Sequence, residues 1–289
     1  MNKINILKSI KKSSLASISM VLILMIIFAS FASPYFLDIY NIQSLIRDLA
    51  FIGMIGIAQS LLLLVGELDL SVGTVASLCG ILAGIMMMNM GIPSYLSLII
   101  ALLFGLVFGT INGLLITKLK LNAMVATIGM QGVYGGINLV LTKGKAITGI
   151  PSEIYILGKG NIGPIPIPFL FTLAVLIGVI FLVKKTKTGR YIYAIGNNRE
   201  ATTILGIKVD NIRVILYAIV GLISALAGVL YVARLGSSQS SIGVNWPMNS
   251  IASAVIGGVA LTGGVGNPAG ALIGATIISV ISNLIVLMG

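Results

Sequence analysis

About nine long apolar stretches, separated by short polar segments, dominate the chain. A helix needs about twenty apolar residues to cross a bilayer, and most of the stretches approach that length. The predicted spans are 15–33, 46–65, 71–90, 94–116, 122–141, 167–183, 212–234, 249–261 and 269–288. The eighth is too short to cross at about 1.5 Å per residue, so we expect a half-helix there. The pattern predicts an all-α, polytopic transmembrane domain that occupies the whole chain, 1–289.

The largest polar interruption, 184–213, lies between the sixth and seventh predicted spans. It contains the features of a short capped helix: an Asn N-cap, an acid three residues later as in a capping box, an apolar stripe at helical spacing, and a glycine that can end the helix in a left-handed conformation. These residues are Asn197, Glu200, Ala201, Ile204, Leu205 and Gly206. A helix of about two turns is marginal alone, so its own protein or a partner should hold it. The segment is therefore predicted to be a docking loop.

Composition supports the membrane class and narrows the chemistry. Hydrophobic residues make up 57% of the chain and charged residues 9%, whereas soluble domains are about half apolar and a quarter charged. The net charge of +11 comes from Lys and Arg between apolar stretches, which indicates cytoplasmic loops rather than nucleic-acid binding. The chain has no His and one Cys, Cys79. This excludes a disulfide framework, a cysteine metal site and His-based catalysis, and no metal or cofactor is expected.

Lys and Arg also predict orientation. The basic residues before the first span, between the fourth and fifth spans and in the docking loop fall on one side under strict alternation, which places the N-terminus and the docking loop in the cytoplasm. Outside the docking loop they are Lys3, Lys8, Lys11, Lys12, Lys118 and Lys120. The opposite side has a longer extracytoplasmic loop, 142–166, which contains Lys143, Lys145 and Lys159 and is expected to hold a short surface helix.

Glycines form close pairs within the spans, such as Gly109 with Gly113, and this spacing lets membrane helices approach closely. A sharper pattern is an internal echo: 66–73 (GELDLSVG) and 257–264 (GGVALTGG) each have glycines seven apart around a Leu-Ser or Leu-Thr pair. Two copies favour related halves with glycine-broken helices, a pattern typical of transport pathways; chance similarity is the alternative. The span count gives a parallel repeat, and an eighth span that fails to cross would make it inverted.

Two acids beside the apolar spans are candidate functional groups. Acids within a membrane domain are costly and tend to be functional, so Glu67 and Asp69 could line or gate a pathway. Equally, Asp69 or Ser71 could cap the third span. Arg47 and Asp48, near the start of the second span, are expected to form an interfacial pair.

A polar stripe follows one face of the fifth span at positions i, i+4, i+7 and i+11, and Asn112 lies within the fourth span. In lipid such a face must turn inward. An amide and hydroxyl lining suits a neutral hydroxylated solute, whereas interhelical hydrogen bonding is the alternative. The complete predicted pathway set is Glu67, Asp69, Ser71, Asn112, Thr127, Gln131, Tyr134 and Asn138.

Neither nucleotide binding nor catalysis is predicted. No Walker A sequence is present, and the glycine-rich segment LTGGVGNPAG lacks the Lys that would reach a phosphate. There is no nucleophile and base set, so an enzyme is disfavoured and any ATP would be hydrolysed by a separate protein.

Four segments resemble the permease subunit of bacterial ABC importers for ribose and other simple sugars. They are GELDLSVG at 66–73, NGLLITKLKLNAMVATIGM at 112–130, GRYIYAIGNNREATTILGIKV at 189–209 and GGVALTGGVGNPAGALIGA at 257–275. The resemblance covers nearly the whole chain. It implies a bacterial inner-membrane protein in lipid, a cytoplasmic ABC ATPase docked on the polar loop, an extracytoplasmic sugar-binding protein, and a pathway formed with a second permease copy in a homodimer. The residues implied in ATPase coupling are Gly189, Arg190, Gly196, Asn197, Glu200, Ala201, Ile204, Leu205, Gly206 and Ile207.

The chain departs from the family pattern on the predicted lining. It has Ala123-Met124 where the family usually has Pro-Phe, and Tyr134-Gly135 where Arg-Gly is common, so the sugar is left undetermined. The family usually has ten spans and a basic tail after a segment like 282–289, so a truncated chain that ends outside is expected. Two alternatives stay open: an ABC permease for another small solute such as an amino acid, and an ion-coupled secondary transporter that uses Glu67 and Asp69.

Overall fold

The computed structural model describes residues 14–288, so the basic residues predicted to mark the cytoplasmic tail, Lys3, Lys8, Lys11 and Lys12, lie outside it. A helix occupies every predicted span. These helices are α2 (Ser14–Ala32), α3 (Ile39–Leu64), α4 (Val72–Met88), α5 (Ser94–Lys118), α6 (Ala123–Thr142), α8 (Ile167–Lys185), α11 (Val209–Leu235), α12 (Trp246–Ile256) and α13 (Pro268–Met288). Within residues 14–288, seven helices are long and apolar enough to cross a membrane, while α4 has 17 residues and α12 has 11. The predicted all-α polytopic domain is confirmed.

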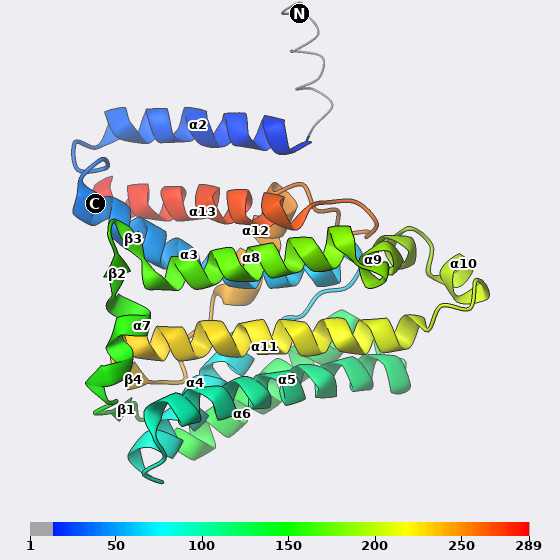
Figure 1. Cartoon of the computed structure of the whole chain (residues 1–289), viewed down its shortest axis with the longest axis horizontal. Helices are drawn as coiled ribbons and strands as arrows, with labels where there is room; N and C mark the ends of the chain where they lie inside the picture. Colours follow the sequence, from blue (N-terminus) through cyan, green and yellow to red (C-terminus); the bar gives the residue numbers. More distant parts are fainter. Residues whose placement is uncertain (1–13, 289) are drawn as a thin grey trace, which may run out of the picture.

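The long helices lie side by side and define two ends of the molecule (Figure 1). At one end, called here the α10 end, α8 is followed by α9 (Lys187–Asn197) and α10 (Arg199–Ile204). The other end carries α7 (Tyr155–Lys159) and the short strands, and is called the α7 end. Helices α3, α4 and α11 form the buried centre, whereas α2 packs against α13 at the edge.

The predicted loop 142–166 is largely structured. It contains β1 (Ile147–Thr148), the 3₁₀ helix η1 (Ser152–Ile154), α7, and the hairpin of β2 (Asn161–Ile162) with β3 (Ile165–Pro166). Strand β1 pairs antiparallel with β4 (Ser237–Ser238), which follows α11. The short helix expected in this loop is therefore present, and its Gly158 packs directly against the backbone of Arg234 on α11.

Glycines set the close approach of α5 and α11. A Cβ atom added at Gly109 would overlap the carbonyl oxygen of Tyr217 and lie 3.0 Å from the Cα of Gly221, and one at Gly113 would lie 2.8 Å from the Cα of Val214. The prediction that this glycine pair lets helices approach closely is confirmed, because nothing larger fits between the two backbones.

The two similar segments 66–73 and 257–264 both lie where a helix ends, and the two endings have the same geometry. The Glu67 N–H donates to the Leu62 carbonyl after α3, and the Val259 N–H donates to the Ala254 carbonyl after α12, both at 2.9 Å. The preceding glycines, Gly66 and Gly258, both have left-handed φ angles of 74° and 82°. Each turn is therefore a Schellman motif. The structural equivalence pairs Gly66 with Gly258, one residue away from the alignment of Gly66 with Gly257 expected from the sequence.

The two copies run in the same direction. Along α3 and α12, the ring of Phe51 stacks on Trp246 at 6.1 Å, and a Cβ at Gly56 would lie 3.2 Å from that of Ser253. Residues later in α3 thus contact residues later in α12. The two helices, and with them the repeated motif, therefore run parallel. Helix α12 is the expected half-helix, and the non-helical segment 257–267 continues to the α10 end, where the Gly264 N–H donates to the Leu64 carbonyl at 2.9 Å. Protein covers part of this irregular backbone, where Gly257, Val259 and Gly263 are buried, whereas Leu261 and Val265 are 55% and 60% exposed.

Candidate functional site

A buried ion triad joins the turn after α3 to the docking loop. One carboxylate oxygen of Glu67, Oε1, accepts from Nη2 of Arg199 at 2.6 Å and from Nε and Nη2 of Arg213 at 2.7 and 2.6 Å. The side chains of Glu67 and Arg213 are 4% and 9% exposed, while that of Arg199 is 43% exposed. Because a buried carboxylate needs compensating charge, Glu67 holds α10 and the start of α11 against the α3–α4 turn.

This connection could not be read from the sequence. Arg213 follows Glu67 by 146 positions, and a basic residue near the start of a predicted span looks like an ordinary interfacial residue. Arg213 also pairs with Asp210 on the first turn of α11 at 2.8 Å, so the same guanidinium anchors its own helix. Because its Oε1 is bound by two arginines, Glu67 has a structural role, and its role in a pathway or gate stays a prediction.

Asp69 lies at the centre of a second buried network. Its Oδ1 accepts from the backbone N–H of Ser71 at 2.7 Å and from the Ser71 hydroxyl at 2.6 Å. The side-chain amide of Asn112 on α5 donates to Asp69 Oδ2 at 3.2 Å and to Ser71 Oγ at 2.8 Å. The Tyr134 hydroxyl on α6 donates to Asn112 Oδ1 at 3.1 Å. Ser71 occupies the N-cap position of α4, but its hydroxyl makes no capping bond.

The polar stripe on α6 turns inward as predicted, with Thr127, Tyr134 and Asn138 buried and Gln131 half-buried. The Thr127 hydroxyl accepts from the Leu70 N–H at 3.1 Å, and the Asn138 amide donates to Ser77 Oγ on α4 at 2.7 Å. These bonds pack α6 against its neighbours. Within residues 14–288, Asn138 Oδ1 is buried without a partner.

A buried amide that the sequence pattern did not single out is Gln59, near the C-terminal end of α3. It is 0% exposed, and both its Oε1 and its Nε2 lack a partner within residues 14–288. In the apolar second half of α3 it has only Ser60 as a polar neighbour and forms no stripe, so only the packed structure reveals it. Buried polar atoms without partners are rare and call for an explanation.

The docking loop contains two helices rather than one. The missed helix, α9, is capped by Thr186, whose hydroxyl accepts from the Gly189 N–H at 3.1 Å. Its inner face packs on the body of the protein, where the Tyr193 hydroxyl donates to the Gly266 carbonyl at 2.8 Å. Burial raises the pKa of that hydroxyl, which keeps it a neutral donor. Gly196 packs directly against the backbone of Leu64 and Gly264.

The predicted N-cap Asn197 is wrong by one residue. Asn197 is the last residue of α9, and Asn198 caps α10 by accepting from the Ala201 N–H at 2.9 Å. Glu200 therefore lies one position too early to complete a capping box. Either asparagine could cap a helix, and the packing of α9 decides which one does, because it extends α9 through Asn197. The predicted left-handed ending at Gly206 is confirmed, with φ at 79°.

Helix α10 presents an uncovered apolar face. Ile204 is 85% exposed and Leu205 77% exposed, and Ala201 on the same face is also exposed. The opposite side is held by buried Thr202 and by the Arg199 ion pair. The other implied coupling residues divide into exposed and packed groups. Arg190, Asn197, Glu200 and Gly206 are exposed, Ile207 is half-buried, and Gly189 and Gly196 make packing contacts.

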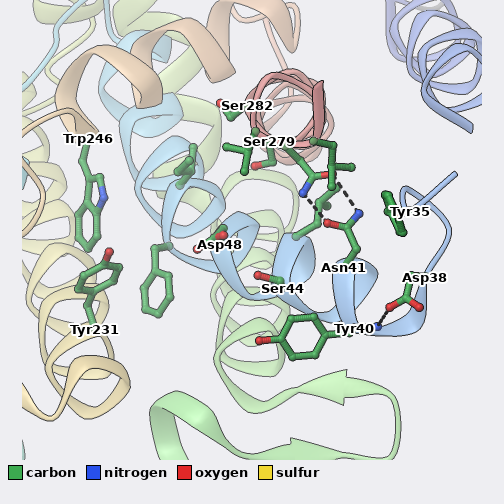
Figure 2. Close-up of a pocket in the computed structure, with 16 residues that line it drawn as sticks. Tyr35, Asp38, Tyr40, Asn41, Ser44, Asp48, Tyr231, Trp246, Ser279 and Ser282 are labelled. Carbon is green, nitrogen blue, oxygen red and sulfur yellow. Dashed lines mark hydrogen bonds between the residues drawn. The ribbon is translucent and has the colours of Figure 1, made fainter. Parts of the chain in front are cut away.

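A cavity of about 580 Å³ lies at the α7 end (Figure 2). It runs beside the first half of α3 and the second half of α13, with Tyr231 of α11 and Trp246 of α12 at one side. None of the eight predicted pathway residues lines it. Asp48, at its edge, pairs with Arg234, whereas Arg47 donates to Asn161 Oδ1 at 3.0 Å. The predicted pair between Arg47 and Asp48 is wrong, because each finds a partner brought in by folding.

Comparison with known proteins connects this architecture to transport. The sequence profile of one family, described as "Branched-chain amino acid transport system / permease component", matches residues 41–289. The chain belongs to this permease family. It is therefore a transport component of a membrane rather than an enzyme, and its seven apolar helices make it a multi-pass membrane protein.

Individual members of this permease family are similar over most of the chain. The ribose import permease protein RbsC of Bacillus subtilis is 38% identical over 93% of this chain and 84% of its own length. The protein of the same name in Escherichia coli K12 is 32% identical, also over 93% and 84%. The autoinducer 2 import system permease protein LsrC of Yersinia enterocolitica is 35% identical over 81% of this chain and 65% of its own length. No solved structure matches.

Proposed function

We propose that this permease imports a simple sugar, with a ribose-like solute as the first candidate, in an ATP-driven importer of the bacterial inner membrane. The support is the similarity to ribose import permeases over 93% of the chain. In this proposal a cytoplasmic ABC ATPase hydrolyses ATP and an extracytoplasmic protein delivers the sugar. A second copy of the chain completes the pathway, and lipid surrounds the assembly.

The distribution of charge favours an α10 end that faces the cytoplasm. Basic side chains gather there on exposed positions, as the positive-inside rule requires of cytoplasmic loops. They are Lys118, Lys120, Lys184, Lys185, Lys187, Arg190, Arg199 and Lys208. The α7 end carries fewer, and Arg234 there is neutralised by Asp48.

The observation that carries the proposal is the exposed apolar face of α10 together with its buried anchor. The face formed by Ala201, Ile204 and Leu205 lies beyond the apolar helices, where a protein cleft rather than lipid would cover it. Arg199, on the first turn of α10, reaches Glu67 in the α3–α4 turn. A displacement of α10 by the ATPase would thus pull directly on the segment that starts α4.

From that segment, the hydrogen bonds of Asp69 lead into the membrane helices. The link through Asn112 reaches α5, and the link from Asn112 to Tyr134 reaches α6. Because these bonds are buried, water cannot readily replace them, and they make α4, α5 and α6 respond together. In this proposal the predicted pathway residues of the network transmit motion, whereas Gln131 and Asn138 retain polar groups for the solute.

The docking role is tested by co-purification of the partner ATPase with permease variants. Leu205→Glu or Ala201→Asp should release the ATPase and abolish ATP-dependent uptake, since a buried Leu contributes about 1.5–3 kcal/mol. Thr203→Gln adds a longer polar side chain on the opposite side of α10, without a charge that would compete with Glu67 for Arg199, and should retain the ATPase. Undiminished recovery of the ATPase with both apolar-face variants would rule out α10 as the docking element.

A further inference from the structure

We propose that the cavity at the α7 end binds the transported solute before it crosses the membrane, and that it selects a neutral hydroxylated molecule of monosaccharide size. The inference rests on the proposed function in one respect, because it takes the α7 end as the outer face. A volume of about 580 Å³ lies within the range of about 300–1,000 Å³ typical of small-molecule sites.

Aromatic side chains form one wall of this cavity (Figure 2). Phe51 lies parallel to Trp246 with ring centroids 6.1 Å apart, and Tyr231 meets both rings nearly at right angles, at 4.8 and 5.6 Å. The three residues come from α3, α11 and α12, so each ring fixes the others. Rigid aromatic faces can pack against the C–H face of a sugar ring at little cost in conformational entropy.

The rest of the cavity is lined by polar groups that can bond to hydroxyls and by aliphatic side chains. Asn41 and Asn283 exchange amide hydrogen bonds at 3.1 and 2.8 Å, which orients both amides. Asn41 also donates to the Phe36 carbonyl at 2.9 Å, so it keeps acceptor capacity only, whereas Asn283 keeps one N–H as well. Ser282 of α13 lines the cavity with an exposed side chain, so its hydroxyl is open to a ligand, whereas the nearby Ser279 hydroxyl is closed off from the cavity. A ligand hydroxyl would therefore bond to Ser282.

The charges of the cavity favour a neutral solute. The carboxylate of Asp48 is paired with Arg234, whose guanidinium also lies 5.6 and 5.7 Å from the rings of Phe51 and Tyr231. The guanidinium is therefore occupied by the carboxylate and by aromatic faces. Asp38 also lines the cavity, and its carboxylate accepts from the Tyr40 N–H at 2.8 Å. A zwitterion would need an unpaired charge of each sign, and this lining supplies a carboxylate but no unpaired cation, whereas a sugar needs only the amides, the hydroxyls and the aromatic wall.

Helix α3 connects this cavity to the coupling end. Its first half lines the cavity, and the turn that ends it holds Glu67 in the ion triad. A solute bound at the α7 end and an ATPase docked at the α10 end would therefore act on the same helix.

Trp246 provides a direct test, because it is the single Trp of the chain and lies in the cavity wall. The purified full-length permease in lipid nanodiscs is titrated with D-ribose, D-galactose and L-leucine while Trp emission is recorded. We expect a saturable change with at least one of the sugars and none with L-leucine. Ser282→Ala should weaken the apparent affinity about fivefold, the effect of losing one hydrogen bond. Thr276→Val removes a hydroxyl from the same helix outside the cavity and should leave the affinity unchanged.

The inference is overturned if neither sugar changes the emission, if L-leucine alone changes it, or if Ser282→Ala binds the sugar as the unmodified protein does. Quenching by brominated lipid together with no sugar response would mean that lipid fills the cavity, and would equally overturn it. ATP-dependent sugar uptake by the assembled importer is measured separately. Uptake without a Trp response refutes the cavity alone, whereas a sugar response without ATP-dependent uptake supports the cavity and refutes the proposed function.

Discussion

Glu67 shows how a single side chain can join two distant parts of a membrane protein. Its Oε1 accepts from two arginines that lie on different helices of the α10 end, while its backbone N–H completes the Schellman turn of α3. The side chain fixes the docking loop and the main chain fixes the helix ending. A buried charge held this way is costly to leave without its partner.

Glu67→Ala is expected to destabilise the folded permease. Arg213 would remain buried with only the exposed Asp210 as a partner, and the loss should approach the lower end of the about 3–5 kcal/mol seen when a buried pair is broken. Thermal unfolding of the purified protein in detergent measures the effect. Glu200→Ala removes an exposed acid from α10 and should change stability by no more than about 0.5 kcal/mol. Equal melting curves for the two variants would contradict a structural role for the triad.

A second prediction at the residue scale concerns Gln131 and Asn138, the amide side chains of the α6 stripe. Asn138→Leu and Gln131→Leu should lower sugar uptake more than they lower membrane insertion, because their polar groups are the least committed of the stripe. Transport of radiolabelled D-ribose is compared with the amount of assembled protein. Asn112→Leu is the contrasting variant, since it disrupts the buried bonds to Asp69 and Tyr134 and should reduce the amount of folded protein itself. Normal uptake with both α6 variants would assign the stripe to packing alone.

At the scale of elements, the close packing of α5 and α11 depends on glycines, which carry no side chain. The backbones approach so closely at Gly109 that any Cβ meets main-chain atoms of Tyr217 and Gly221, and main-chain atoms cannot rotate away. This contact holds the central layer in place without relying on apolar side chains, which lipid would solvate equally well.

Gly109→Ala should therefore destabilise the protein by about 1–3 kcal/mol, the usual effect of overpacking. The matched control is Gly132→Ala on α6, where an added Cβ meets nothing within 4 Å. It should be neutral or stabilise the protein by up to about 1 kcal/mol, because Ala is the better helix former. Thermal unfolding in detergent measures both variants, and a neutral Gly109→Ala would show that the two helices can separate at no cost.

At the scale of the whole molecule, the chain alternates between the two ends, and the proposed orientation follows from the α10 end being cytoplasmic. Single cysteines that replace Lys120 or Lys187 should be protected from a membrane-impermeant maleimide in intact cells, while those at Lys145 and Lys159 should react. All four positions are exposed. The native Cys79 is buried, so it should add little background. Labelling of the Lys187 position from outside would refute both the orientation and the docking role.

The sequence by itself determined the class of the molecule and the location of its long apolar helices. Apolar length decides both, because a bilayer offers no water to an unpaired peptide group and any long apolar stretch must satisfy its backbone as a helix. Local sequence patterns also predicted three smaller features correctly. They are the short eighth span, the inward turn of the α6 stripe and the left-handed glycine after α10.

Only the tertiary structure decided which polar groups meet. Glu67 and Arg213, Asn41 and Asn283, and Asp48 and Arg234 are pairs whose members lie on separate helices or, for Glu67, in the turn after α3. It also decided that Asn198 rather than Asn197 caps α10, because the packing of α9 sets where that helix ends. Helical spacing specifies a face but not the neighbour that covers it. Partner choice depends on how helices cross and on how closely glycines let them approach, and these are properties of the assembled fold.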